Sequence, residues 1–202
     1  MARRSIGLAV AVVLASAGWR RVEAEDSLRV VIRIHAARGV QSGVADRSRV
    51  RVETILSHAG IRVAWRDCRA SAVRGSGCDE AASPDEALVR LLSGPPTLSA
   101  DGCGVALVPT SGPAHFISLF VDCIHGAADA LMLDEDVIFA YTLAHEIGHL
   151  LLGSAHEPLG LMRAQPRAID WERAAHGGLM FTPDEARRLQ QALISRARVR
   201  TD

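Results

Sequence analysis

Apolar and polar residues alternate in two segments of the first third of the chain, and a helical pattern lies between them. Leu28–Ala36 and Ile61–Arg66 both show the two-residue period of a half-buried strand. Asp46–His58 instead has apolar residues at near-helical spacing, and Gly60 follows as a residue suited to end a helix. The sequence therefore predicts a strand, a helix and a second strand in succession.

The middle of the chain predicts two more strands, Val105–Val108 and Phe116–Ile124, which are separated by a Ser-Gly-Pro turn. Residues 67–83 and 94–102 are rich in small and turn-forming residues and are predicted to be loops. Between these loops, Ser83-Pro84-Asp85-Glu86 resembles a helix start and precedes the apolar run ALVRLL. That pattern is compatible with either a short helix or an extended segment.

The last third of the chain predicts two helices. Val137–Leu152 is an apolar helix preceded by acidic residues and ended by Gly153. Residues 154–178 are predicted to be irregular, and Thr182 and Pro183 then supply the cap and first position of a final helix. We therefore predict an α+β fold in which a small mixed β-sheet of about four strands packs against the Val137–Leu152 helix.

The N-terminus has the features of a secretory signal peptide. Arg3 and Arg4 precede the apolar segment Ile6–Ala17, and small residues then offer cleavage sites, the later of which is after Ala24. The apolar run is about 12 residues, whereas a membrane-spanning helix needs about 20. We expect residues 1–24 to be a cleaved signal peptide and residues 25–202 to form one domain that is secreted or periplasmic in a bacterium.

Four cysteines fit the oxidising environment that such export implies. Three pairings are possible, and Cys68–Cys78 with Cys103–Cys123 is favoured because each bond closes a local segment. A zinc site built from cysteine is the alternative, but the chain has no C-x-x-C spacing to favour it.

Composition narrows the class of protein further. The chain has 202 residues, of which 49% are apolar, so it can form one domain with a substantial core. Its 23 basic and 23 acidic residues give a formal net charge of zero without a long basic run. Nothing therefore indicates a nucleic-acid partner, and no stable membrane association is expected after signal cleavage.

The motif that indicates chemistry is HEIGH, which covers residues 145–149. By chance this composition would produce H-E-x-x-H roughly 0.015 times. On a helix, His145 and His149 leave the same face with Cα atoms about 6 Å apart, so both can bind one zinc ion. Glu146 lies about 100° around the helix and is placed to act on water as a general base.

A catalytic zinc ion needs a third protein ligand and one open position. Gly153 allows a sharp turn after the helix, and His156 follows three residues later as the favoured third ligand. Glu157 is the alternative, since it would complete a His₂Glu set. Asp170 is a weaker candidate for a carboxylate that accepts a hydrogen bond from the other ring nitrogen of a zinc-bound histidine.

The run HEIGHLLLGSAH resembles the metzincin signature H-E-x-x-H-x-x-G-x-x-H, with one extra Leu before the Gly. The following Gly160-Leu161-Met162 resembles the Met-turn of that clan, and the whole segment is similar to a group of small exported bacterial metzincin-like proteins. The resemblance implies a metallopeptidase fold, one Zn²⁺, a peptide or protein substrate, and Met162 beneath the imidazoles. Metzincins often have a Tyr after the Met-turn, which this chain lacks; Arg163, His176 or a backbone N–H is left to stabilise an oxyanion.

Two functions remain at this point. The first is a zinc metallopeptidase that hydrolyses peptide bonds with Glu146 as general base. The second is an exported zinc-binding protein whose site is retained without catalysis. The intact Glu146 favours the enzyme, because a purely structural zinc site does not need that carboxylate.

Overall fold

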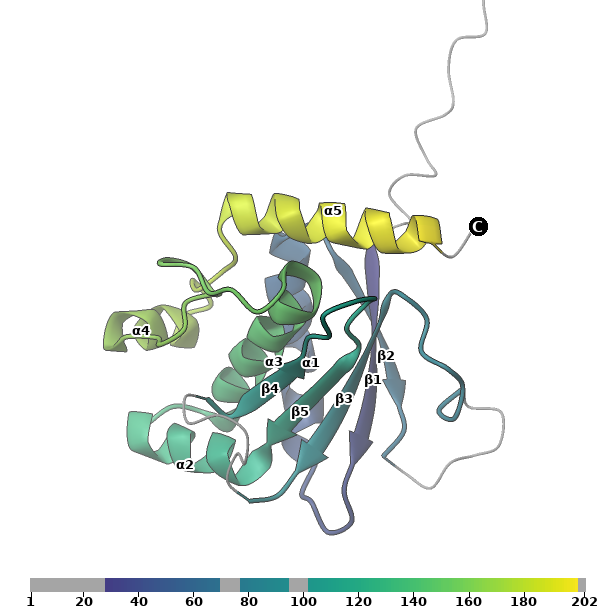
Figure 1. Cartoon of the computed structure of the whole chain (residues 1–202). Coiled ribbons are helices and arrows are strands. Elements are labelled where there is room, and N and C mark those ends of the chain that lie inside the picture. Colours follow the sequence, from purple (N-terminus) through teal and green to yellow (C-terminus); the bar gives the residue numbers. More distant parts are fainter. Residues whose placement is uncertain (1–27, 70–76, 95–101, 200–202) are drawn as a thin grey trace, which may run out of the picture.

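The protein forms a mixed five-stranded sheet covered on one face by helices (Figure 1). This computed structural model describes residues 28–69, 77–94 and 102–199. The predicted signal peptide and part of each of the two predicted loops lie outside these residues. The elements follow the chain in this order: β1 (Arg29–Ala36), α1 (Gly43–His58), β2 (Arg62–Asp67), β3 (Glu86–Leu92), β4 (Gly104–Leu107), β5 (Phe116–Phe120), α2 (Val121–Leu131), α3 (Glu135–Leu152), α4 (Ala168–Ala175) and α5 (Pro183–Val199).

The strand order in the sheet is β2-β1-β3-β5-β4. All neighbouring strands are parallel except β4, which runs antiparallel to β5 at one edge. The inward positions of the strands pack against α1 and α3, and α5 lies across one end of this layer (Figure 1). The predicted mixed sheet and its packing against the Val137–Leu152 helix are confirmed, with that helix starting two residues earlier, at Glu135.

The segment after Ser83 is a strand, β3, which brings the sheet to five strands instead of about four. Alternate residues of ALVRLL are fully buried, as a central strand requires. Glu86 begins a strand because β3 pairs with β1 on one side and with β5 on the other. Its carboxylate also accepts hydrogen bonds from Arg33 Nη2 at 2.6 Å and Arg66 Nη1 at 2.8 Å. Pairing with neighbouring strands therefore makes this segment extended, although its local sequence favoured neither a helix nor a strand.

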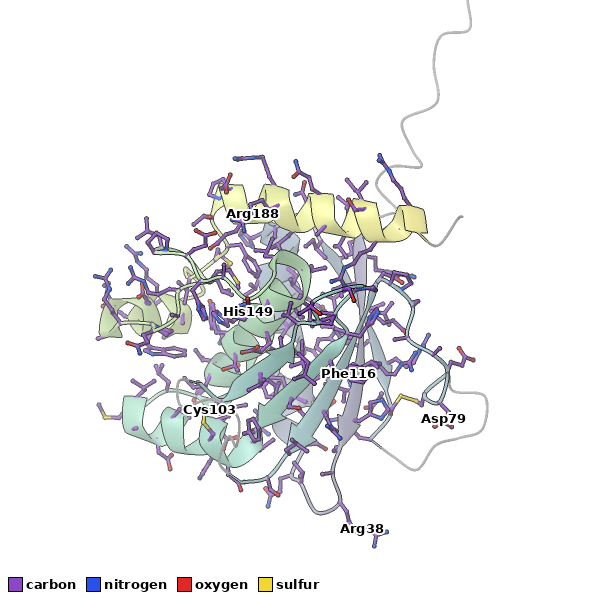
Figure 2. The ribbon with its side chains drawn as sticks, in the orientation of Figure 1. Arg38, Asp79, Cys103, Phe116, His149 and Arg188 are labelled. Atoms are coloured by element: carbon purple, nitrogen blue, oxygen red, sulfur yellow. A yellow bond between two sulfur atoms is a disulfide. The ribbon has the colours of Figure 1, made fainter. Side chains whose placement is uncertain are left out.

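The outer face of β1 is contacted by Cys78, one partner of the Cys68–Cys78 disulfide, whose carbonyl accepts a hydrogen bond from Arg33 Nη1 at 3.4 Å. Arg33 lies on this face and is only 2% exposed, because its guanidinium donates to Glu80 O at 2.7 Å as well as to Glu86. The Cys103–Cys123 disulfide is also present, so the favoured cysteine pairing is confirmed. Cys103 and the Asp79 loop lie on opposite sides of the molecule in Figure 2.

Two sequence predictions were wrong about helices. Phe116–Ile124 is a strand only to Phe120, where α2 begins; the apolar run continues through both elements, so it does not mark the boundary. Residues 154–178 are not irregular throughout, because Ala168–Ala175 forms α4. The start of α4 is fixed by Asp170, which accepts the Arg167 backbone N–H at 2.9 Å.

Candidate metal centre

Helix α3 carries His145, Glu146 and His149 into the interior of the molecule. The helix is apolar around most of its circumference and is buried against the sheet, α1 and α5. Glu146 is 6% exposed and His149 is 8% exposed. Buried polar side chains of this kind need partners, so the surroundings of each group indicate what it binds.

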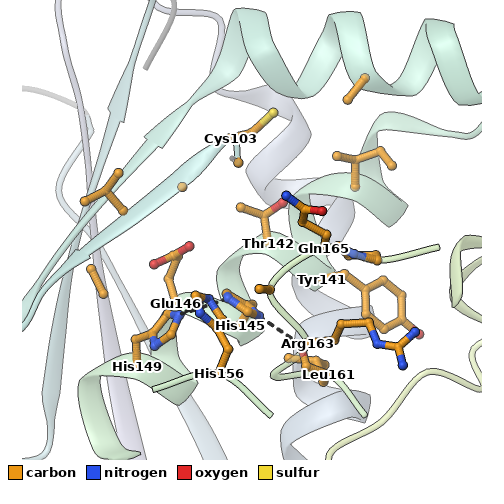
Figure 3. Close-up of a pocket in the computed structure, with 18 of the residues that line it drawn as sticks. Cys103, Tyr141, Thr142, His145, Glu146, His149, His156, Leu161, Arg163 and Gln165 are labelled. Carbon is orange, nitrogen blue, oxygen red and sulfur yellow. Dashed lines mark hydrogen bonds between the residues drawn. The ribbon is translucent and has the colours of Figure 1, made fainter. Parts of the chain in front are cut away.

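A turn at Gly153 returns the chain to the histidines of α3. Gly153 has a φ of 93°, which a residue with a side chain rarely adopts, and it ends the helix. His156 then lies beside His149, with 3.2 Å between the two Nε2 atoms, while His149 Nε2 is 3.0 Å from His145 Nε2 (Figure 3). One nitrogen from each of the three imidazoles lies within 4.8 Å of the others.

The other ring nitrogens show which atoms carry protons. His145 Nδ1 donates to Leu161 O at 2.8 Å, and His149 Nδ1 donates to Gly153 O at 2.9 Å. A carbonyl oxygen only accepts hydrogen bonds, so both Nδ1 atoms are protonated and both Nε2 atoms present lone pairs in the neutral ring. Burial, helped by the neighbouring imidazoles, lowers the pKa of His145 to about 4 and also lowers the pKa of His149.

Two lone pairs that face each other at 3.0 Å repel unless a cation lies between them. Zinc–nitrogen bonds of about 2.0–2.1 Å in a tetrahedral site place ligand nitrogens roughly 3.3 Å apart. The observed separations of 3.0 and 3.2 Å are close to that value, and imidazole is a preferred zinc ligand. The residues therefore fit a zinc ion bound by three histidines, and the backbone carbonyls hold two of the rings in the required tautomer.

The alternative ligands lie outside this cluster. Glu157 Oε1 is bound by Arg188 Nη1 at 2.5 Å instead. Asp170 does not support an imidazole, since its carboxylate binds Arg163 Nη1 at 3.0 Å and the Arg167 N–H. Among the three candidates for additional metal-site roles, only His156 is brought to the histidine pair.

Glu146 lies beside the histidines and faces β4 (Figure 3). A Cβ placed on Gly104 would lie 2.7 Å from Glu146 Cγ, so only a glycine lets the strand approach this closely. Burial raises the pKa of Glu146 to about 7, and the Ala106 N–H opposes that rise. A glycine in a strand is typical of close backbone approach, so Gly104 carried a sequence signal for a contact that the motif alone does not reveal.

Met162 is fully buried and packs against α3 at Gly148. A Cβ on Gly148 would lie 2.2 Å from Met162 Sδ and 3.3 Å from Phe181 Cε1. The glycine of HEIGH therefore provides the space that the methionine side chain occupies.

A cavity of about 900 Å³ opens next to the three histidines and Glu146. Residues of β4 line part of it, and its lining also includes the apolar side chains of Leu131, Ile138, Trp171 and Leu179. Arg163 lines this cavity, whereas His176 is absent from its lining and is exposed. Arg163 is also held by Asp170 and by the carbonyl of Pro158, to which its Nε donates at 3.0 Å.

No protein-family model matches this sequence, and no curated protein resembles it significantly. Among solved structures, the chain is similar to the crystal structure of archaemetzincin from Methanopyrus kandleri. The two share 18% sequence identity and superpose with a TM-score of 0.49, over 83% of this chain and 96% of the archaemetzincin chain. A likeness at this level does not establish a function, so the proposals below rest on the residues of the site.

Proposed function

We propose that this protein is a zinc-dependent peptidase in which His145, His149 and His156 bind one Zn²⁺ and Glu146 is the general base. The observation that carries the proposal is the convergence of three imidazoles beside a buried carboxylate in an open cavity. The Nε2 atom of His149 lies 3.0 Å from that of His145 and 3.2 Å from that of His156. Three histidines leave a fourth zinc position free, as a catalytic site requires.

Bound zinc would supply a Lewis acid that polarises an amide carbonyl and lowers the pKa of water towards about 7. Glu146 would accept the proton of the attacking water and later deliver a proton to the leaving amine. Its confinement by Gly104 keeps the carboxylate beside the histidines, and its pKa of about 7 suits a group that both accepts and donates a proton.

The edge of β4 supports a peptide as the substrate. Within the described sheet, β4 pairs with β5 on one side only, and its residues line the cavity. An edge strand presents N–H and C=O groups that an extended peptide can pair with. A peptide bond held along β4 would lie beside both Glu146 and the histidines.

The site of action is proposed to be outside the cytoplasm, with residues 1–24 as signal peptide and residues 25–202 as the peptidase domain. The two disulfides support this proposal, because such bonds persist in oxidising compartments. Within the part of the chain that the structure describes, no helix has the length and apolar character needed to cross a membrane.

The proposal is tested with Glu146→Gln, which keeps the size of the side chain and removes its basicity. The variant should bind one equivalent of zinc and lose cleavage of an unfolded protein substrate by at least about 100-fold. Glu172→Gln is the matched control, since it makes the same change on the exposed face of α4 and should leave cleavage unchanged.

Undiminished cleavage by Glu146→Gln would overturn the role of Glu146. Zinc bound at one equivalent without cleavage by the unaltered protein, across several substrates, would instead identify the non-catalytic zinc-binding protein.

A further inference from the structure

The first turn of α5 contains an unusually buried carboxylate. Thr182 and Glu185 form a reciprocal capping pair: the Thr182 N–H donates to Glu185 Oε2 at 2.6 Å, and the Glu185 N–H donates to Thr182 Oγ1 at 3.2 Å. A capping carboxylate needs no burial for this function, yet Glu185 is 1% exposed. Burial of a carboxylate has a free-energy cost, which indicates further interactions on its other side.

Those interactions are with the backbone turn at Gly160-Leu161-Met162. A Cβ on Gly160 would lie 2.8 Å from Glu185 Oε2, and Gly160 has a φ of 75°. The backbone N–H of Met162 favours the charged form of the Glu185 carboxylate. The buried Oε1 atom of Glu185 has no hydrogen-bond partner among the described residues. The carboxylate thus fills the space directly behind the turn.

This turn holds one of the histidines of the metal centre. Leu161 O accepts the hydrogen bond from His145 Nδ1 at 2.8 Å. The turn is fixed on its other edges by Leu161 N–H donating to Met180 O at 3.2 Å and Glu157 N–H donating to Met162 O at 2.9 Å. A shift of the turn would therefore rotate or release the His145 ring.

Helix α5 also contacts Glu157, which lies a few residues before the Gly160–Met162 turn. Arg188, one turn after Glu185, binds Glu157 Oε1 at 2.5 Å, and Glu157 directly follows His156. In Figure 2, Arg188 projects from α5 on the side of the molecule where His149 lies. One helix therefore contacts both ends of the segment that contains His156 and the partner of His145.

We propose that Glu185 is a positioning residue for the metal centre, which holds His145 through the Gly160–Met162 turn, and that Arg188 supports His156 through Glu157. This inference rests on the proposed function, because it assumes that the three histidines bind zinc. Neither residue touches the substrate or the metal. Their expected contribution is to hold the ligands in place before the metal arrives, so their loss should weaken zinc binding.

The test compares Glu185→Gln with Asp184→Asn. Both variants remove one negative charge from the first turn of α5, but Asp184 is exposed and pairs with Arg187 at 2.6 Å. Asp184 lies 3.9 Å from Arg188, which keeps its shorter 2.5 Å contact with Glu157 in the control. The zinc dissociation constant is measured by competition with a chromophoric chelator, and the unfolding temperature is measured on the metal-free protein. Glu185→Gln should raise the zinc dissociation constant roughly 10- to 100-fold, and Asp184→Asn by less than about twofold.

A second pair of variants keeps the proposal testable if Glu185→Gln does not fold. Arg188→Met breaks a partly exposed ion pair, and Arg187→Met breaks an exposed one on the same helix. Only Arg188→Met should weaken zinc binding, and cobalt bound to that variant should show an altered visible spectrum because His156 is less fixed.

The possible results distinguish a failure of the positioning role from a failure of the proposed function. If the unaltered protein binds no zinc, the proposed function fails. If it binds zinc and Glu185→Gln lowers only the unfolding temperature, with both test variants matching their controls in zinc affinity, the positioning role is wrong while the proposed function stands.

Discussion

Replacement of Gly104 by alanine tests whether β4 confines Glu146, the proposed general base. The new methyl group would meet Glu146 Cγ at 2.7 Å, Thr142 Cγ2 at 2.8 Å and Glu146 Oε1 at 2.9 Å. Gly104 does not have a positive φ, so alanine is compatible with the backbone and the effect comes from the contact alone.

The expected loss of kcat depends on whether β4 or the Glu146 side chain moves to accommodate the new methyl group. Strand β4 is tied to α2 by the Cys103–Cys123 disulfide and is paired with β5, so it cannot easily retreat from the helix. Inserting a methyl group into such a contact costs about 1–3 kcal/mol. If Glu146 absorbs that cost by leaving its productive position, kcat falls roughly 5- to 150-fold, since about 1.4 kcal/mol corresponds to a factor of ten.

The assay measures kcat, KM and zinc affinity for Gly104→Ala beside Gly102→Ala. A Cβ on Gly102 would meet nothing closer than 4.0 Å, so that variant should behave as the unaltered protein does. Gly104→Ala should lower kcat while zinc affinity changes less than about threefold, because the atoms nearest the new methyl group belong to Glu146 and Thr142 and to none of the three histidines. Full kcat in a folded Gly104→Ala protein would refute the idea that this strand positions Glu146.

Three further predictions concern the scaffold. Converting Cys103 and Cys123 to serine should lower kcat more than the same change at the other disulfide, measured at a temperature where all variants are folded, because only this bond holds β4. Arg196→Met should lower the free energy of unfolding by about 3 kcal/mol in denaturant titrations, since Arg196 donates to three backbone carbonyls, including the Leu150 carbonyl near the end of α3; a loss below about 0.5 kcal/mol would contradict this. The backbone N–H of Arg167, aided by Arg163, lowers the pKa of Asp170, so this carboxylate contributes stability above its ordinary pKa of about 4 and loses it as the pH falls through the lower folded value. Asp170→Asn should therefore be less stable than the unaltered protein at pH 7, and the difference should shrink as the pH falls below about 4; a difference that does not shrink with acid would disprove the assignment.

The local signals in the sequence were sufficient where an element has a regular apolar period and a clear end. Strands β1 and β2 form where the alternation of residues 28–36 and 61–66 predicted them, and glycine marks the end of both α1 and α3. The predicted half-burial was wrong for β1, which is a central strand buried on both faces. The boundary between β5 and α2 was missed because the apolar run crosses it without a glycine or proline. Helix α4 was missed because Asp170 caps it from inside the helix while also binding Arg163, a contact that spacing along the chain does not reveal.

The candidate site divides in the same way. The pair His145 and His149 follows from helical periodicity alone. The sequence favoured His156 over Glu157 as third ligand, and the structure places His156 beside the pair while Arg188 binds Glu157 from a helix thirty-one residues later. The burial of Glu185 against Gly160 is equally long-range, so a capping motif in the sequence gave no sign of its proximity to the metal centre.

An anomalous difference map at the zinc edge, from crystals grown with zinc, would show whether the three histidines bind one ion. We expect one peak, about 2.0–2.1 Å from Nε2 of His145, His149 and His156, with a fourth position left to water. A zinc-saturated crystal with no peak there, or with Glu157 in place of His156 as ligand, would contradict it.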